Sequence, residues 1–253
     1  MKNKSLAIPL SLTFLFQSIL TLGLFAQTPK LPTKWTSEAM KSSNPFPDYP
    51  RPQLVRNQWK SLNGKWDYIG GKEKANALNP KSPINFSQKS EQILVPYCPE
   101  SVISGIERKQ EINMWYRRFF QIPKDWNGKN VLINFEAVDY DATVFINGKS
   151  AGRHSGGYDA FSFDITSLLH AGNNEIIVAA YDSNDGRTPS GKNGPRGDYT
   201  FSSGVWQSVW LEPVAKTYAK NIRLLPDVEN SRLQVIVDGH SANIIATALD
   251  GKK

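Results

Sequence analysis

The polar segment from Asp182 to Ser203 reads DSNDGRTPSGKNGPRGDYTFSS and holds the residues best suited to ligand chemistry. Asp182, Asn184 and Asp185 stand in its first four positions, and carboxylate and amide oxygens accept hydrogen bonds from hydroxyl groups. Irregular segments of this length are uncommon and often functional. We interpret the segment as a binding loop with these three residues as candidate ligand contacts. The alternatives are a solvated insertion and, for Asp182, the commoner role of capping a loop.

Metals and phosphates fit this segment poorly. The stretch 186–192 nearly copies a phosphate-binding loop, but Asn193 replaces the hydroxyl that holds Mg²⁺, and Pro195 opposes the helix that should follow. Asn193 also stands where a calcium loop of the EF-hand type needs its closing glutamate. The 3 histidines lack metal-ligand spacing. We therefore expect no metal and no cofactor.

No catalytic group stands out. Paired carboxylates can hydrolyse a glycoside, but the sequence does not select the pair that lies about 5 Å apart. His154 and Ser155 are adjacent on an expected strand and point to opposite faces. Cys98 is the single cysteine, which excludes an internal disulfide, and its apolar surroundings in VPYCPES favour a buried thiol. We predict no catalytic residue in this chain.

The elements that would position the loop are short strands separated by turns, a pattern typical of an all-β sandwich. Ala142, Val144 and Ile146 share one face of a strand, and Asn147-Gly148 is a strong hairpin signal. Residues 166–171 resemble a helical turn, and residues 70–90 a loop. The expected strands are 64–69, 115–122, 131–135, 142–146, 149–154, 161–165, 175–181, 205–211, 219–225, 233–237 and 244–249.

The N-terminus has the pattern of a secretory signal peptide over residues 1–26. Lys2 and Lys4 precede an apolar stretch that ends at Ala26. An uncleaved membrane anchor is the alternative, because the stretch is close to the ~20 residues that a span needs. Six prolines then exclude a long helix, so residues 27–58 are expected to form an extended lead-in. We predict a secreted or periplasmic protein, free of the membrane after cleavage.

Composition limits the function classes. Of the 253 residues, 40% are hydrophobic, which allows a sizeable core. The net charge of +7 is not gathered into a basic run, so nucleic-acid binding is not expected. The 7 tryptophans suit either a core or stacking on sugar rings.

Several motifs in this order resemble the N-terminal sugar-binding domain of glycoside hydrolase family 2, which includes β-galactosidases, β-glucuronidases and β-mannosidases. The resemblance covers about residues 44–213. The motifs are PRPQLVRNQWKSLNGKWDY, VPYCPESVISGI, WYRRFFQIP, VDYDATVFINGKSAGRHSGGYDAFSFDIT, NNEIIVAAYDSNDG and SGVWQSVWLEP.

The resemblance implies a jelly-roll (galactose-binding-like) β-sandwich over residues 59–213. An immunoglobulin-like sandwich would begin at 214–253, incomplete with three strands where about seven are needed. A catalytic (β/α)₈ barrel carrying two catalytic glutamates would follow, and no residue of this chain inherits their roles. Asp182 matches the position at which some family β-galactosidases extend an aspartate into the substrate pocket.

We therefore expect the N-terminal carbohydrate-binding fragment of an exported family 2 glycoside hydrolase. Its partners would be a β-glycoside or oligosaccharide and the catalytic barrel of the intact enzyme. The intact enzyme would hydrolyse β-glycosidic bonds, and the fragment alone would be inactive. The alternatives are a stand-alone carbohydrate-binding module and a structural domain that packs on a catalytic partner.

Overall fold

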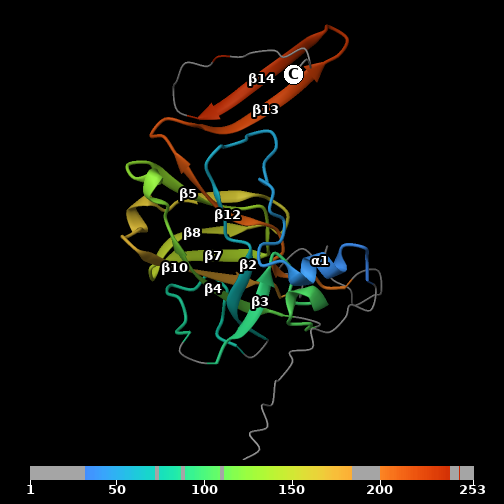
Figure 1. Ribbon diagram of the computed structural model, residues 1–253, viewed down its shortest axis with the longest axis vertical. Coiled ribbons are helices and arrows are strands. Elements are labelled where there is room, and N and C mark those ends of the chain that lie inside the picture. The colour runs from blue at the N-terminus through green and yellow to red at the C-terminus, as the bar shows by residue number, and fades with distance from the viewer. Residues whose placement is uncertain are drawn as a thin grey trace, which may run out of the picture.

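The computed structural model describes residues 32–71, 74–86, 89–108, 111–183, 200–239 and 245. The predicted signal peptide, Asn184, Asp185 and the predicted strand 244–249 apart from Ile245 lie outside this part of the chain. The described residues form layered antiparallel sheets with few helical turns (Figure 1), which confirms the all-β class. In these segments no helix combines the length and apolar character that a membrane span requires.

The larger layer is a six-stranded antiparallel sheet with the order β3-β2-β4-β10-β7-β8. Its strands are β2 (Gly64–Gly71), β3 (Glu91–Val95), β4 (Asn113–Gln121), β7 (Asp141–Ile146), β8 (Lys149–Ser155) and β10 (Asn173–Tyr181).

The facing layer is a four-stranded sheet with the order β1-β12-β5-β9, and two strand pairs complete the structure. The four strands are β1 (Lys60–Ser61), β5 (Asn130–Phe135), β9 (Phe161–Asp164) and β12 (Val209–Val214). The pairs are β6 (Val138–Asp139) with β11 (Gly204–Val205), and β13 (Ala219–Asp227) with β14 (Arg232–Gly239). The helical turns are α1 (Thr36–Lys41), η1 (Val102–Ser104), η2 (Lys124–Trp126) and η3 (Thr166–Leu168).

Period-two alternation decides which side chains fill the space between the sheets. Ala142, Val144 and Ile146 of β7 point into this core, as predicted, and are fully buried. Phe145, which points to the opposite face of the sheet, is also buried, because it belongs to a second apolar cluster behind the sheet. Residues 74–86, predicted only as a loop, cover that rear face through Ala77 and Phe86. Both faces of the six-stranded sheet are therefore packed.

The predicted hairpin at Asn147-Gly148 is confirmed. Both residues have positive φ, +50° and +78°, as a tight two-residue turn between β7 and β8 requires. The Asn147 side chain donates to Leu168 O (2.9 Å) and to Asn174 Oδ1 (2.8 Å), and it accepts from the Glu175 N–H (2.9 Å). The turn thereby fixes β10 and η3 as well as its own two strands.

Three expectations about local structure were wrong. The predicted strand 205–211 is divided into β11 and β12, because the chain leaves the sheet between Val205 and Val209. The strand β3 was missed, since its apolar run is short and Pro96 follows it. The lead-in is not wholly extended: α1 forms within it, upstream of the prolines at 45–52.

A buried carboxylate attaches the lead-in to the four-stranded sheet. Glu212 of β12 is fully buried and accepts hydrogen bonds from Arg51 (2.5 Å), Arg56 (2.9 Å), Tyr49 (2.6 Å) and Trp210 (2.6 Å). A buried charge is tolerated only when it is paired and hydrogen-bonded. Glu212 therefore fixes residues 49–56 against β12.

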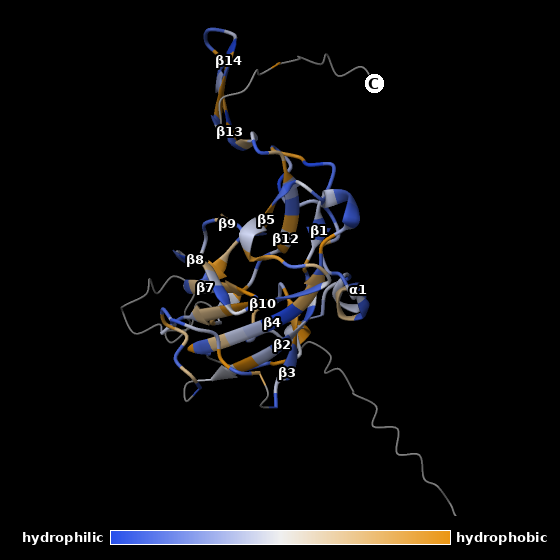
Figure 2. Cartoon of the chain, turned by 90° about the vertical axis from the view of Figure 1, so that its left-hand side faces the viewer, coloured by the Kyte–Doolittle hydropathy of each residue, from blue (hydrophilic) through white to orange (hydrophobic). Residues whose placement is uncertain are grey.

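The β13–β14 hairpin projects from the sandwich beyond β12 (Figures 1 and 2). Arg56 connects the two by donating to Ala219 O at 2.7 Å and by lying over the Tyr218 ring. Several apolar side chains of the hairpin are exposed, namely those of Leu224, Leu225, Val228, Leu233 and Val235. Its assignment to an immunoglobulin-like domain that begins at residue 214 stays a prediction.

Replacing Glu212 should make folding less stable and change its acid dependence. Burial alone raises the pKa of Glu212, but hydrogen bonds from Trp210 and Tyr49 and the charge of Arg51 bring it below the ordinary value of 4.5. The stabilisation is therefore complete above that value and is lost as the pH falls through the lower folded-state pKa. We expect Glu212→Gln to lower the free energy of unfolding by about 3–5 kcal/mol at pH 7.

Urea denaturation between pH 3 and 7 measures this effect. The difference in the free energy of unfolding between the variant and the wild type should become smaller toward pH 3. Glu229→Gln is the matched control, because Glu229 is exposed. A gap that stays constant with pH would show that the ionised form of Glu212 is not what stabilises the fold.

Candidate functional site

Asp182 lies where β10 ends and the polar loop begins. Its N–H donates to Ile112 O at 3.0 Å, and the preceding carbonyl, of Tyr181, accepts from the Tyr140 N–H at 3.3 Å. Tyr181 also pairs with Asn113 on one side and with β7 on the other. Asp182 is only 2% exposed. The structure thus fixes its backbone at the edge of the six-stranded sheet, at the residue where the polar loop begins.

Acidic side chains gather around this edge, and two of them have basic partners inside the domain. Asp141 accepts from Arg153 at 2.8 Å and from the Ser155 hydroxyl. Glu111, which is fully buried, lies 3.2 Å from the Arg108 guanidinium. Asp141 supports the framework of the site because its charge is compensated, whereas Arg108 compensates the charge of Glu111 only in part.

Glu111 occupies a tightly packed position beside Tyr68. Burial raises the pKa of Glu111, and the charge of Arg108 offsets this only in part. Burial likewise raises the pKa of Tyr68 well above its ordinary value. A Cβ at Gly70 would lie 2.2 Å from the Tyr68 hydroxyl and 2.5 Å from Glu111 Oε2, so the backbone passes here without space for a side chain.

Glu100 holds the other end of the polar loop. The Ser203 hydroxyl donates to its Oε1 at 2.7 Å, and the Ser203 N–H donates to its Oε2 at 3.2 Å. Burial raises the pKa of Glu100, although both bonds from Ser203 favour its charged form. Gly204 follows with a φ of +71°, and the Val205 N–H donates to the Tyr116 hydroxyl at 3.3 Å. The loop therefore returns to the sandwich at a fixed point.

Both ends of the loop are thus held by named contacts, at Asp182 and at Ser203. A rigid base is what a loop needs in order to present polar groups to a ligand. Carboxylate oxygens at such a base can accept hydrogen bonds from sugar hydroxyls. In the segments that the structure describes, no group of three or more His, Cys, Asp or Glu is placed to hold a metal ion.

Cys98 stands close to this clamp but has the features of a structural thiol. It is half-buried, and burial raises the pKa of its thiol, with the negative charge of Glu100 adding to the effect. A raised pKa keeps the sulfur protonated and unreactive.

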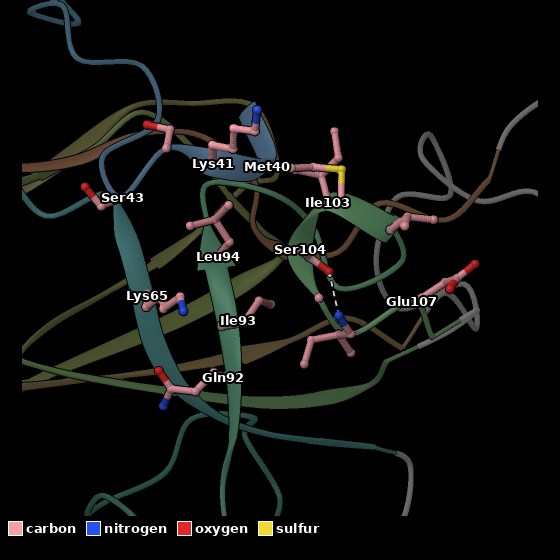
Figure 3. Close-up of a pocket in the computed structure, with 14 residues that line it drawn as sticks. Met40, Lys41, Ser43, Lys65, Gln92, Ile93, Leu94, Ile103, Ser104 and Glu107 are labelled. Carbon is pink, nitrogen blue, oxygen red and sulfur yellow. Dashed lines mark hydrogen bonds between the residues drawn. The ribbon is translucent and has the colours of Figure 1, made fainter. Parts of the chain in front are cut away.

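A separate cleft lies elsewhere, along the free edge of β3. It has a volume of about 720 Å³ and is bounded by α1, β3 and η1. Figure 3 shows Lys65 and Gln92 on one side of it, Ile103 and Ser104 on the other and Lys41 above. Sequence reasoning did not indicate this cleft, although residues 102–106 of its wall belong to the motif VPYCPESVISGI, because its other walls come from distant segments of the chain.

These features define an all-β sandwich with a polar loop fixed at both ends. The model of the family described as "Glycosyl hydrolases family 2, sugar binding domain" matches residues 97–214. This match confirms that residues 97–214 resemble a family 2 sugar-binding domain, as the sequence motifs indicated. The matched range contains Glu100, Glu111, Asp182 and Ser203.

Known proteins with similar sequences and structures agree with this assignment. A β-galactosidase of Thermoanaerobacter pseudethanolicus is 28% identical over 76% of this chain and 25% of its own length. The crystal structure of a Bacteroides uniformis β-glucuronidase is 28% identical with a TM-score of 0.50, covering 64% of this chain and 18% of that one. An uncultured Clostridium β-glucuronidase is 20% identical with a TM-score of 0.55 over 74% of this chain and 35% of that one, and it supports the fold alone.

This chain spans about a quarter of the length of the β-galactosidase that it matches. The activity, substrate and partners of a whole enzyme are therefore taken up only as proposals below.

Of the three predicted contact residues, the structure describes Asp182, whereas Asn184 and Asp185 lie outside the described residues. The role of all three in binding stays a prediction. Sequence reasoning missed Glu100 and Glu111, although both stand in or near the motif VPYCPESVISGI. Ser203, the partner of Glu100, is distant from it in the sequence. In addition, no local sequence pattern indicates that a carboxylate is buried.

Removing the Ser203 hydroxyl should weaken the loop clamp. The hydroxyl binds the ionised form of Glu100, so we expect Ser203→Ala to lower the free energy of unfolding at pH 7 by about 1.5 kcal/mol. The raised pKa of Glu100 means that its contribution to wild-type stability is complete below 4.5 and is lost as the pH rises through the folded-state pKa. The decrease in unfolding free energy caused by Ser203→Ala should therefore become smaller as the pH falls through the folded-state pKa of Glu100.

Denaturation curves at pH 4 and pH 7 test this, with Ser150→Ala as the control because Ser150 is exposed on β8. An equal loss at both pH values would contradict a bond to the charged carboxylate.

Proposed function

We propose that this chain is the N-terminal carbohydrate-binding part of an exported family 2 β-glycosidase. The observation that carries the proposal is that the two loop anchors, Asp182 and Ser203, both lie within the match to the sugar-binding domain. The names of its relatives, a β-galactosidase and β-glucuronidases, support a β-glycoside as the ligand class. The N-terminal pattern of residues 1–26 supports export to the periplasm or outside the cell.

In the proposed intact enzyme, two carboxylates of a catalytic barrel would cleave the glycosidic bond by double displacement. The chemistry of the described residues fits a binding role. Asp141 and Glu212 are hydrogen-bonded to arginines, so these two carboxylates support the framework of the sandwich. The domain would position sugar near the barrel through Asp182 and the polar loop. By itself it would not hydrolyse glycosides.

A structural role is the second candidate, and the β13–β14 hairpin favours it. Leu224, Leu233 and Val235 are each about half exposed, at 45%, 59% and 45%. Apolar surface of this kind often marks contact with another protein surface. A stand-alone carbohydrate-binding module is the third candidate, and it would need affinity for sugar without any partner.

Calorimetry with a panel of β-linked oligosaccharides distinguishes these roles. We expect Asp182→Asn to weaken the binding of the best oligosaccharide about tenfold, the equivalent of one hydrogen bond to a charged group. Asp125→Asn is the matched control, because Asp125 is exposed on η2. A variant in which a short Gly-Ser linker replaces residues 184–199 should lose binding and keep the thermal unfolding midpoint of the sandwich.

Two results would count against the proposal. If the folded chain binds no oligosaccharide, the structural role is favoured. If the chain hydrolyses p-nitrophenyl β-galactoside or β-glucuronide, and a point mutation within residues 27–253 abolishes that turnover, the expected lack of activity is wrong.

A further inference from the structure

A second hollow of about 380 Å³ lies beside the segment that connects β11 to β12. Its volume falls within the range of about 300–1,000 Å³ that is usual for small-ligand sites. The side chains that matter are Phe46, Asp48 and Tyr49 of the lead-in, Glu136 after β5, and Trp206 and Gln207 after β11. We call this hollow the aromatic pocket.

Two aromatic rings of the pocket are held in place by hydrogen bonds. Trp206 donates its indole N–H to Gly157 O at 2.9 Å, and its ring meets Tyr158 edge to face at 6.0 Å. The Tyr49 hydroxyl donates to Glu212 at 2.6 Å. Fixed rings lose little conformational entropy when a ligand binds, so these walls are preorganised.

The third ring, Phe46, is held in an unfavourable backbone conformation. Its φ is +53°, a left-handed value that is a real outlier for a bulky residue, and its side chain is 58% exposed. Asn63 maintains this conformation by donating to Pro45 O at 3.0 Å, and the ring leans on Tyr97 at 5.9 Å. Backbone strain that keeps an apolar ring in solvent is typical of a functional position.

The buried side-chain amide of Asn63 also positions the polar side of the aromatic pocket. Asn63 Nδ2 donates to Ser208 Oγ at 3.1 Å, and the Ser208 N–H donates to Glu136 Oε2 at 3.2 Å. The Asn63 Oδ1 accepts from the Val209 N–H at 2.9 Å. One side chain, 3% exposed, therefore sets both the ring of Phe46 and the carboxylate of Glu136.

We propose that the aromatic pocket is a binding subsite for a neutral hexose unit of a carbohydrate. Aromatic faces stack on the C–H face of a pyranose, and carboxylate and amide oxygens accept hydrogen bonds from its hydroxyls. The charged side chains among the described lining residues, Asp48 and Glu136, are both acidic, so the pocket repels the carboxylate of a uronic acid. The inference rests on the proposed carbohydrate-binding function and specifies a place and a sugar class for it.

The cleft along β3 has a different lining and serves as an internal comparison. Lys41, Lys65 and Glu107 line it, together with aliphatic side chains such as Ile103 (Figure 3). It has no aromatic ring among its described lining residues, so it offers nothing on which a pyranose could stack. The selectivity for neutral sugar is therefore expected of the aromatic pocket alone.

The test is NMR titration of the full chain with two monosaccharide probes, methyl β-glucoside and methyl β-glucuronide, which differ only at C6. We expect the glucoside to shift the Trp206 indole signal and the backbone signals of residues 206–208, and the glucuronide to bind at least about fivefold more weakly. Trp206→Phe identifies the indole signal. Phe46→Ala should weaken glucoside binding about fivefold, whereas Phe46→Tyr, which keeps an aromatic ring, should retain the wild-type affinity. Phe119→Ala removes an exposed ring of β4 and should have no effect.

Each contrary outcome has its own meaning. Glucoside shifts confined to residues 111–113 and 181–183 would overturn the aromatic pocket and leave the proposed function standing. Equal affinity for the glucuronide would overturn the selectivity for neutral sugars. Failure of both probes to shift any signal of the folded chain would overturn the pocket, and the oligosaccharide calorimetry would then decide the proposed function separately.

Discussion

The burial of one carboxylate, Glu212, is the constraint on which much of this structure depends. A charge in a protein interior must be compensated, and the chain supplies the compensation from residues more than 150 positions away, with Arg51 and Arg56 reaching across from the lead-in. Because these partners must stay close, an otherwise irregular proline-rich segment is fixed to β12. That segment then contributes Tyr49 to the aromatic pocket, so an electrostatic requirement in the sheet shapes a surface.

Local sequence signals predicted most of the sandwich. The alternation at Ala142, Val144 and Ile146 and the Asn147-Gly148 turn carry their structural information within a few residues, and both were correct. The division of the predicted strand 205–211 was not predictable in this way. Trp206 leaves the sheet because its indole N–H donates to the carbonyl of Gly157, which lies between β8 and β9. Contacts between distant segments decide such details, and a single sequence does not display them.

The candidate site was likewise predictable from the sequence only in part. The length and polarity of the loop after β10 indicated Asp182 as a residue of interest, and the structure does place it at a fixed edge of the sheet. The contacts of Glu100 with Ser203 and of Asn63 with Pro45 were not predictable, because each joins segments that only the folded chain brings together. Composition also left the uses of tryptophan open. Trp66, Trp115 and Trp210 fill the interior, whereas Trp206 is partly exposed.

The two anchors of the polar loop have a consequence for how such a domain can diversify. The bonds of Asp182 to Ile112 and of Ser203 to Glu100 lie at the two ends of the loop, so each end is fixed by a residue outside the loop. Closing a longer loop costs little, only about 0.6 kcal/mol for each doubling of its length. We therefore expect the length of the loop to vary at this position, in evolution or by grafting, as long as its two anchors are kept.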